Sequence, residues 1–460
     1  MDSQKIVTRL KKLQEVGSMK EVLPLTNYLF PGKHCPLMGA AIAVRGIEDA
    51  LIIVIGTNEC TYYTKTLALS DEFGGIAGRC LSVVLDHNDV TFGSVEKTEK
   101  AFREMYDEYK PSCVFLVTTC VVEIIGDDFD ALSYALSDEY QIPVMAVHTE
   151  HFKSQDHMPG IERTMTSCIE IMKEQDVNDN VVNVLGQRLG SFVGTELHDI
   201  LTKQNIEVGL MMPSGCTVPD IEKAPNAKVN VVVHETALPL AKKMKQRFNT
   251  PYVLFERMAD PDRTMKCYEE LFNFLEINLL DEIHEKYEES RKLVLDAVTK
   301  LKGISYVYGN TPYRNFEINE FMCKLGMKPE LIQLSEIAPQ DAEYKTSIEK
   351  NHNPYVTFGA NIAPLQHVYD VLKPNLYLGH EYALRLQKKG IAVVATDRAN
   401  SLLGFETTKF LLEELVFSSE ASIRYKTEIL TGIETTKMGG HPAHISKSGG
   451  HPAHIKRGGM

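Results

Sequence analysis

Residues 50–55 read Ala-Leu-Ile-Ile-Val-Ile, an unbroken apolar run that ends at Gly56. A continuous run rich in β-branched residues predicts a strand buried on both faces, as in a parallel sheet, because a half-exposed strand would alternate. Three further runs of this kind follow at residues 81–85, 113–117 and 142–147. Since the segment 96–109 between them has helical spacing, we predict a first βαβ domain over residues 1–165.

The same alternation of apolar runs and helical segments continues along the chain. The polar stretch 174–180 predicts a linker, and a second domain over residues 180–290 follows it. Its candidate strands are residues 181–185, 207–211, 229–233 and 252–255. A third domain, over residues 300–436, has candidate strands at 304–308, 331–334, 355–358, 376–378 and 391–394. The sequence therefore predicts an α/β protein of three doubly wound, Rossmann-like domains with parallel sheets.

The last residues, 437–460, differ in composition. The heptapeptide Gly-Gly-His-Pro-Ala-His-Ile occurs at residues 439–445 and again at 449–455. Such a segment cannot bury a core, so we predict a disordered Gly/His-rich tail. Loose metal binding by the histidines and an appended tag are alternative interpretations.

Composition excludes several classes of protein. The net charge of −13 argues against binding to the phosphate backbone of nucleic acid. No stretch approaches the ~20 apolar residues of a membrane span, and the charged N-terminus lacks the apolar core of a signal peptide, so we expect a cytoplasmic protein. In that reducing compartment the nine cysteines should be buried apolar residues or metal ligands, not disulfides.

Three cysteines occupy positions where ligands collect in open α/β sheets. Cys60 and Cys120 each follow the carboxyl end of a predicted strand, and Cys35 lies in a loop ahead of a small-residue run. Thiolates are soft ligands of the kind that hold iron–sulfur clusters. Gly39 and Gly56 nearby could let the backbone approach such a cluster and donate N–H groups to it. The gaps of 25 and 60 residues match no compact motif, so buried structural thiols remain the alternative.

The sequence around these cysteines resembles the nitrogenase component 1 superfamily. The resemblance is carried by Cys-Pro-Leu-Met-Gly-Ala-Ala from residue 35, Cys-Thr-Tyr-Tyr from residue 60 and Thr-Thr-Cys-Val-Val-Glu-Ile-Ile-Gly-Asp-Asp over 118–128. It extends to residues 182–186, 228–234 and 403–406. The Thr-Thr-Cys motif and the Leu-Gly-Phe-Glu ending are closer to the superfamily's β-type subunits. The superfamily includes the nitrogenase molybdenum–iron protein, its cofactor scaffold and dark-operative protochlorophyllide reductases.

The resemblance implies an iron–sulfur component of an ATP-driven, two-component reductase. Cys35, Cys60 and Cys120 would ligate a 4Fe–4S or larger P-cluster-like cluster, shared with a homologous subunit in a hetero- or homo-oligomer. Electrons would come from a separate, ATP-dependent iron–sulfur reductase homodimer and pass to a substrate or cofactor pocket between the domains. Consistently, the chain has no Gly-x-x-x-x-Gly-Lys-Ser/Thr loop for nucleotide phosphates.

Departures from the family's pattern restrict the activity. His234, with Glu235 beside it, stands where nitrogenase has a cofactor-ligating cysteine, and residues 395–401 contain no histidine. This argues against dinitrogen reduction by a cofactor held in this chain. We predict instead that His234 and Glu235 line a pocket for a small-molecule or tetrapyrrole-like substrate and donate protons there. A metallocofactor assembly scaffold, and an α/β binding protein without a cluster, are the alternatives.

Other candidates have a plain structural interpretation beside the functional one. His148, His151, His157 and Glu150 follow a predicted strand and could bind metal or lie at an interface. Cys216 could face the pocket, and Cys80, which opens a predicted strand, could approach the cluster region. Cys113, Cys168, Cys267 and Cys323 are expected to be buried.

Overall fold

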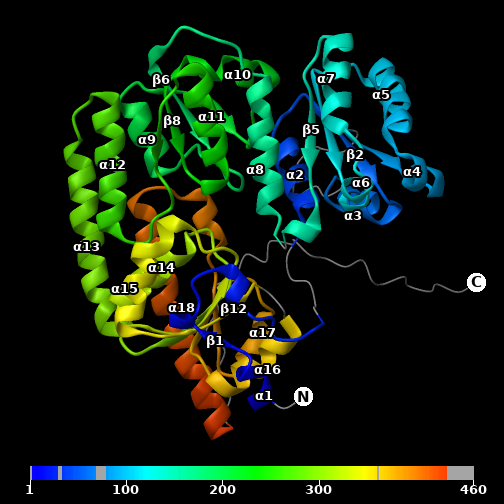
Figure 1. Ribbon diagram of the computed structural model, residues 1–460. Coiled ribbons are helices and arrows are strands. Elements are labelled where there is room, and N and C mark those ends of the chain that lie inside the picture. The colour runs from blue at the N-terminus through cyan, green and yellow to red at the C-terminus, as the bar shows by residue number, and fades with distance from the viewer. Residues whose placement is uncertain (1–2, 29–33, 69–78, 155, 360–361, 433–460) are drawn as a thin grey trace, which may run out of the picture.

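The computed structural model describes residues 3–28, 34–68, 79–154, 156–359 and 362–432. Three sheets dominate this part of the chain, and helices cover both faces of each (Figure 1). The predicted α/β class with three parallel sheets is therefore confirmed. The predicted Gly/His-rich tail, residues 437–460, lies outside the described residues.

The first sheet has strand order β3-β2-β4-β5, all parallel. Its strands are β2 (Ala50–Gly56), β3 (Cys80–Val84), β4 (Cys113–Thr118) and β5 (Val144–His148). Its helices are α2 (Pro36–Arg45), α3 (Asn58–Ala68), α4 (His87–Phe92), α5 (Val95–Tyr109), α6 (Cys120–Ile125), α7 (Phe129–Tyr140) and α8 (Met158–Ser167). Every residue of β2 and β4 is buried, which explains why these two strands are continuously apolar in the sequence.

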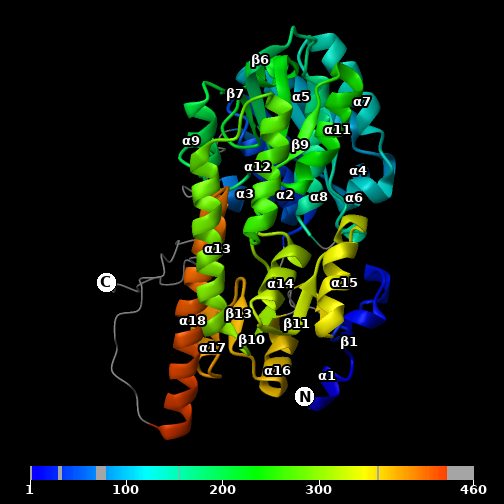
Figure 2. The ribbon, with the colours of Figure 1, turned by 90° about the vertical axis from the view of Figure 1, so that its left-hand side faces the viewer.

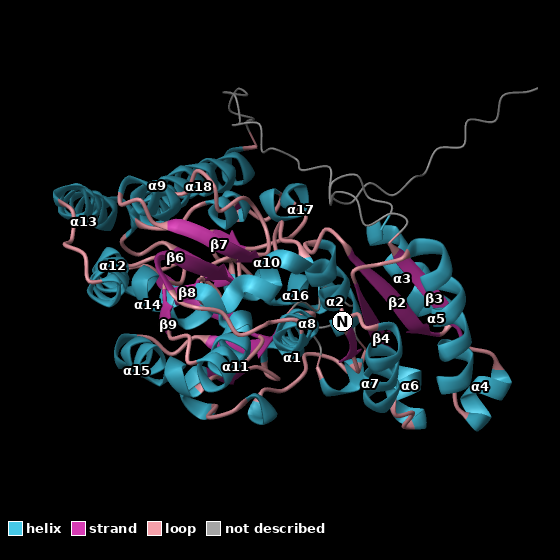
Figure 3. Cartoon of the chain, turned by 90° about the horizontal axis from the view of Figure 1, so that it is seen from above, coloured by secondary structure: helices cyan, strands magenta, loops and turns pink. Residues whose placement is uncertain are grey.

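The second sheet repeats this arrangement with the order β7-β6-β8-β9. Its strands are β6 (Asn178–Leu185), β7 (Glu207–Met212), β8 (Ala227–Val232) and β9 (Tyr252–Leu254). Its helices are α9 (Glu196–Lys203), α10 (Val218–Lys223), α11 (Leu238–Phe248), α12 (Pro261–Leu275) and α13 (Asp281–Leu301). Seen from above, the first two sheets lie side by side with α2 and α8 between them (Figure 3). One hydrophobic core is continuous across both sheets.

The third sheet has the order β1-β12-β11-β10-β13-β14. Its strands are β1 (Lys11–Lys12), β10 (Ser305–Tyr308), β11 (Lys328–Leu334), β12 (Tyr355–Phe358), β13 (Leu376–Leu378) and β14 (Ala392–Val394). Its helices are α1 (Ser3–Val7), α14 (Asn315–Lys324), α15 (Ala342–Asn351), α16 (Ile362–Leu372), α17 (Ala383–Gln387) and α18 (Phe405–Thr431). The long helices α13 and α18 pack together along its flank (Figure 2).

The N-terminal segment lies with the third sheet and not with the first. Strand β1 pairs antiparallel with β12, and α1 packs on α16. The apolar side chains of Leu13 and Val16 enter the core of the third sheet. The first sheet and its helices are thus built from residues after the segment 3–28, whereas the sequence pattern groups residues 1–165 in one domain. The remaining boundaries, near residues 180, 290 and 300, stay a prediction.

Two glycines set the distance between α2 and α8. A Cβ on Gly39 would lie 1.9 Å from the carbonyl oxygen of His157, and one on Gly160 would lie 1.8 Å from that of Pro36. The two backbones therefore approach as closely as backbones without Cβ atoms allow. This contact fixes the start of α2 against the start of α8. In the part of the chain that the structure describes, no helix is long and apolar enough to cross a membrane.

Candidate functional site

The three predicted cluster cysteines open three helices at the carboxyl edge of the first sheet. Cys35 is the N-cap residue of α2, Cys60 lies in the first turn of α3 and Cys120 is the first residue of α6. Helix α3 follows β2 and α6 follows β4, and these strands pair in parallel with Ile55 opposite Thr118. The connections that carry Cys60 and Cys120 are therefore neighbours, as the sequence predicted.

The three thiols interact electrostatically. Burial raises the pKa of Cys60, and the neighbouring Cys120 and Cys35 raise it further, while a hydrogen bond with Thr57 opposes the shift. All three cysteines are free and partly exposed. A metal ligand needs this access, which a fully buried structural cysteine lacks.

The thiols do not converge on a single point. Among the described residues, no group of three or more His, Cys, Asp or Glu side chains is arranged to hold one metal ion. This spacing does not suit a mononuclear site. In a polynuclear iron–sulfur cluster each thiolate binds a different iron atom, so its ligands stand further apart. The donor set, three soft thiols, fits such a cluster.

Two aromatic side chains border Cys35. Tyr63 hydrogen-bonds the imidazole Nδ1 of His34, and the ring of His34 lies 6.3 Å from that of His157. Burial, together with the neighbouring Cys35, raises the pKa of Tyr63 to about 12. The tyrosine therefore stays protonated beside the thiol and can act as a hydrogen-bond donor at neutral pH.

The structure gives Gly39 and Gly56 a packing role. Gly39 makes the helix contact described above, and a Cβ on Gly56 would lie 2.3 Å from the hydroxyl oxygen of Thr119. Gly56 thus allows the Cys60 connection to lie against the residue that precedes Cys120. That either glycine donates an N–H to a bound cluster stays a prediction.

Cys120 receives a hydrogen bond from the backbone. The N–H of His151 lies 3.1 Å from the sulfur of Cys120. Residue 151 belongs to the turn that follows β5, and His148 at the end of β5 contacts Glu123 of α6 at 2.8 Å. The hydrogen bond between His148 and Glu123 raises the pKa of His148, although burial opposes the shift. The turn after β5 is therefore tied to the cysteine-bearing helix.

A second polar group lies where the three units meet. The His157 imidazole contacts the Arg188 guanidinium at 3.2 Å and the Asp156 carboxylate at 3.0 Å. Arg314, from the third unit, pairs with Glu256 at 3.1 Å and with Asp341 at 3.0 Å. These ion pairs are mostly buried, so loss of one partner would leave the other charge buried without compensation and destabilise the protein.

The predicted pocket residues His234 and Glu235 lie within this charged group. Burial, and then the nearby Arg188 and Arg257, hold the pKa of His234 well below its usual value, so the imidazole is neutral. Its Nδ1 accepts the N–H of Thr236 at 3.2 Å, which leaves the proton on Nε2. Burial and the Glu256 carboxylate raise the pKa of Glu235 to about 7.

Sequence reasoning missed the arginines of this group. Arg257 is buried, donates to the carbonyl oxygens of Ala399 and Asn400 at 3.0 Å, and hydrogen-bonds Gln187. Arg188 follows β6 directly after Gly186 and Gln187, at the carboxyl edge of the second sheet. That position could have identified it, by the same rule that selected Cys60 and Cys120.

The other cysteine candidates are buried or partly buried, and the Glu256 carboxylate of the charged group adds to the effect of burial in raising the pKa of Cys267. Cys216 is buried, and its backbone N–H donates to the carbonyl oxygen of Gly46. Burial raises its pKa to about 12. Cys113, Cys168 and Cys267 are buried as expected, and Cys80 and Cys323 are partly buried.

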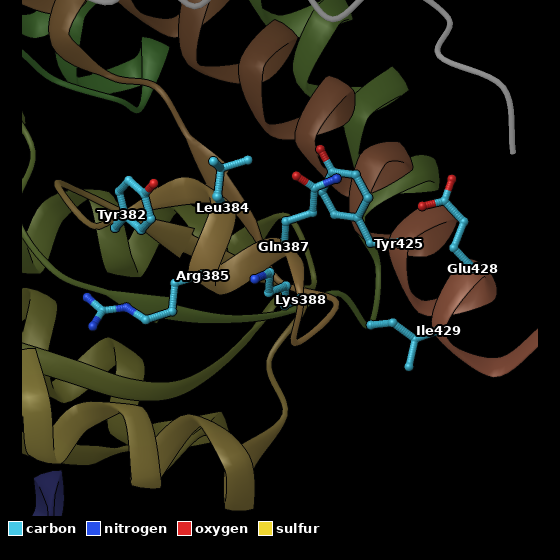
Figure 4. Close-up of a pocket in the computed structure, with 8 residues that line it drawn as sticks. All are labelled: Tyr382, Leu384, Arg385, Gln387, Lys388, Tyr425, Glu428 and Ile429. Carbon is cyan, nitrogen blue, oxygen red and sulfur yellow. The ribbon is translucent and has the colours of Figure 1, made fainter. Parts of the chain in front are cut away.

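A surface pocket of about 920 Å³ lies elsewhere, between α17 and the end of α18 (Figure 4). Tyr382, Arg385, Tyr425 and Ile429 are among its lining residues. It belongs to the third unit, far along the chain from the cysteines, and contains no cysteine or histidine. Its volume alone therefore gives it no role in cluster chemistry.

The sequence between Cys35 and the middle of α18 identifies the family. A model of the family described as "Nitrogenase component 1 type Oxidoreductase" matches residues 35–417. The chain belongs to this family. Members of the nitrogenase component 1 family generally bind iron–sulfur clusters and form oligomers with homologous subunits.

Relatives of this nitrogenase component 1 family protein include proteins named for cofactor biosynthesis. It is 27% identical over 308 residues to the nitrogenase iron–molybdenum cofactor biosynthesis protein NifE of Rippkaea orientalis, covering 64% of each chain. To the NifE protein of Clostridium pasteurianum it is 27% identical over 279 residues, covering 59% of each. The alignments thus span less than two thirds of these relatives.

The molybdenum–iron protein is a more distant relative. The alpha chain of Clostridium pasteurianum is 25% identical over 236 residues, which are 49% of this chain and 44% of that one. The solved structure titled "Nitrogenase Cp1 at pH 6.5" superposes with a TM-score of 0.73 at 17% identity, covering 87% of this chain and 94% of that chain. At that identity it establishes the fold. Because the relatives named here are NifE proteins and an alpha chain, the closer likeness to β-type subunits stays a prediction.

Proposed function

We propose that this chain is the cluster-binding subunit of a nitrogenase-like, two-component reductase. The observation that carries the proposal is that Cys35, Cys60 and Cys120 begin three helices at one edge of the first sheet. Both other thiols contribute to the raised pKa of Cys60. An iron–sulfur cluster bound there would supply one-electron storage. The three thiolates would hold it, and the His151 N–H would donate to one of its ligand sulfurs.

Partial exposure of the thiols supports a cluster that is shared between subunits. Cys35, Cys60 and Cys120 all reach the surface of the chain. Three ligands from one chain leave positions that a homologous subunit can fill, in a 4Fe–4S or a larger, P-cluster-like cluster. We therefore propose a hetero- or homo-oligomer in which the thiol edge of the first sheet is part of the interface.

Exposed apolar side chains support docking of the electron donor on the same unit. Phe92 at the end of α4 is 85% exposed and Ile124 of α6 is 74% exposed, and α4 packs against α6. Helix α6 begins at Cys120, so a protein bound over these side chains would lie close to the cluster. Large exposed apolar residues near one another favour a protein interface. The proposed partner is an ATP-dependent iron–sulfur reductase homodimer.

The charged group between the units is the proposed substrate site. Glu235, with a pKa of about 7, can donate a proton near neutral pH, and His234 presents a neutral imidazole with its proton on Nε2. Each electron added to an organic substrate usually needs a proton, so such donors suit a reductase. Arg188 and Arg257 would attract an anionic part of a small-molecule or tetrapyrrole-like substrate.

A second function is favoured by the NifE relatives. Their printed name describes cofactor biosynthesis, and the alignments cover 59% to 64% of their length. On this alternative the same thiols and the same charged group would hold a metallocofactor during its assembly. Transfer of bound metal to an acceptor protein, without substrate turnover, would distinguish the scaffold from the reductase.

The first test is the iron and acid-labile sulfide content of anaerobically purified protein, with EPR spectra before and after reduction. Wild type is compared with Cys60→Ala and with Cys80→Ala, a matched control for a partly buried thiol in the same unit. We expect iron and a reducible signal in wild type and in the control, and their loss in Cys60→Ala. Iron-free wild type, or an unchanged signal in Cys60→Ala, would overturn the ligand assignment.

A further inference from the structure

The turn of residues 148–151 at the end of β5 delivers a backbone donor to the sulfur of Cys120. The His151 N–H approaches that sulfur at 3.1 Å, so this turn lies against the start of α6. A hydrogen bond to a ligand sulfur is sensitive to a small displacement of the donor, because its strength falls steeply with angle and distance. The contacts that hold this turn in place therefore determine how well the His151 N–H donates to the sulfur.

The first end of the turn is anchored by a network of side chains. The His148 imidazole contacts Glu123 of α6 through Nδ1 at 2.8 Å and Asp130 of α7 through Nε2 at 3.3 Å. The Thr118 hydroxyl, at the end of β4, also donates to the Glu123 carboxylate. Since Glu123 stands three residues after Cys120 on α6, this network fixes the turn directly against the cysteine's own helix.

The second anchor is a buried carboxylate next to His151. Glu150 is only 3% exposed, and its two oxygens pair with different cations, Arg163 at 2.6 Å and Lys153 at 3.0 Å. The same guanidinium nitrogen of Arg163, on α8, donates to the carbonyl oxygen of His148 at 2.6 Å. One arginine therefore clamps the turn at residues 148 and 150. A buried carboxylate is costly unless it is paired, so this geometry is strongly specified.

We propose that this doubly anchored turn is a positioning element for the Cys120 sulfur, with Glu123, Glu150 and Arg163 as its positioning residues. By holding the His151 N–H on the sulfur it stabilises negative charge there. In the loaded protein this would favour the reduced cluster, a consequence that rests on the proposed function. The placement of the N–H on the sulfur does not rest on it.

The test compares two variants of the donor residue. His151→Pro eliminates both the N–H and the imidazole, whereas His151→Ala keeps the N–H and removes only the imidazole. Residue 151 opens a short 3₁₀ helix, and Glu150 before it has φ −60° and ψ 115°, so proline fits the backbone at this position. The pair therefore separates the backbone donor from the side chain.

Two measurements are made. In metal-free protein, exchange of the His151 N–H with deuterium is followed by mass spectrometry in Glu150→Ala and in Lys153→Ala, the control that keeps the Arg163 contact. In loaded protein, the midpoint potential is measured by EPR-monitored redox titration. We expect exchange several-fold faster in Glu150→Ala than in Lys153→Ala, and we expect His151→Pro to weaken reduction about tenfold, which is about 59 mV for one electron. His151→Ala should match the wild-type potential.

The outcomes separate this proposal from the proposed function. Equal exchange of the His151 N–H in Glu150→Ala and Lys153→Ala would overturn the anchoring of the turn, and equal potentials in the proline and alanine variants would overturn the positioning role. Faster exchange in Glu150→Ala, in a protein that never holds iron, would leave the anchored turn intact and overturn the cluster. If His151→Pro does not fold, Glu150→Ala replaces it in the potential measurement, with Lys153→Ala as the control. A weaker reduction in Glu150→Ala supports the proposal, and no difference from Lys153→Ala overturns it.

Discussion

The thiol edge of the first sheet and the charged group between the units use opposite chemistry on the same fold. Cys35, Cys60 and Cys120 are soft, partly exposed groups. The charged group instead contains mostly buried ion pairs, as at Arg314. Both occupy carboxyl edges of parallel sheets, where the fold places ligands. The difference teaches that position in the fold selects where a site forms, while residue type selects what it binds.

Breaking an ion pair should lower the free energy of unfolding far more in the charged group than on the exposed surface of the first unit. Arg314→Ala leaves Glu256 and Asp341 buried without their cation, so we expect a loss of about 3–5 kcal/mol in the free energy of unfolding. Urea denaturation measures it. Arg103→Ala is the control, because its pairs with Glu99 and Glu139 lie on the surface of the first unit and should leave stability unchanged. Equal effects of the two substitutions would contradict the contrast.

The two regions are also mechanically connected, through the contact between α2 and α8. Gly39→Ala would push its Cβ against the carbonyl oxygen of His157. Gly39 belongs to α2, which begins after Cys35, and His157 contacts Arg188 of the charged group. We expect a cost of about 1–3 kcal/mol from overpacking, measured by thermal unfolding. Gly17→Ala is the control, because its Cβ would lie 3.5 Å from the nearest atom, the Oε2 of Glu21. If Gly39→Ala proved as mild as the control, the close approach of the helices would be wrong.

The parallel sheets could be predicted because their signal is local. Strands β2 and β4 are buried throughout, so their apolar runs delimit them to within a residue or two. Helix α5, Val95–Tyr109, matches the predicted helical segment 96–109 to within a residue, because its charges and spacing repeat over several turns. Cys60 and Cys120 could be placed at one edge because each follows a strand.

What the sequence could not predict depends on contacts between distant segments. Lys11 and Lys12 carry no strand pattern, and only pairing with β12 makes them a strand. Arg257 has the local pattern of an ordinary polar residue, and its role appears only where the chain near residue 400 lies beside it. The donor to Cys120 is a backbone N–H, which no side-chain motif can indicate.

Two carboxylates, one in each region, should respond to pH with opposite sign. Burial raises the pKa of Glu123, but hydrogen bonds with His148 and Thr118 outweigh it and the net pKa is lowered. Its stabilisation is therefore present above the unfolded value of about 4.3 and is lost as pH falls. Because the pKa of His148 is raised, the stabilisation that depends on its protonated imidazole is lost as pH rises beyond about 6.5.

Glu123→Gln should thus destabilise the protein most between about pH 4.3 and pH 6.5, by about 1–2 kcal/mol. Urea denaturation across that range measures the difference from wild type. The difference should shrink below about pH 4, where the wild-type carboxylate is protonated as well. A difference that does not change with pH would show that the carboxylate charge is not what holds the turn.

Glu235 should show the smallest effect, with the reverse sign. Burial and the Glu256 carboxylate raise its pKa to about 7, above the unfolded value of about 4.3. The native state therefore holds this proton more tightly, and wild-type stability falls as pH rises between those values. Glu235→Gln removes the cost, so the variant should equal wild type near pH 4 and exceed it near pH 8. Because Glu235 reaches solvent, we expect less than about 1 kcal/mol. Parallel stability curves for the two proteins would show that Glu235 titrates normally, and its assignment as a proton donor near neutral pH would then fail.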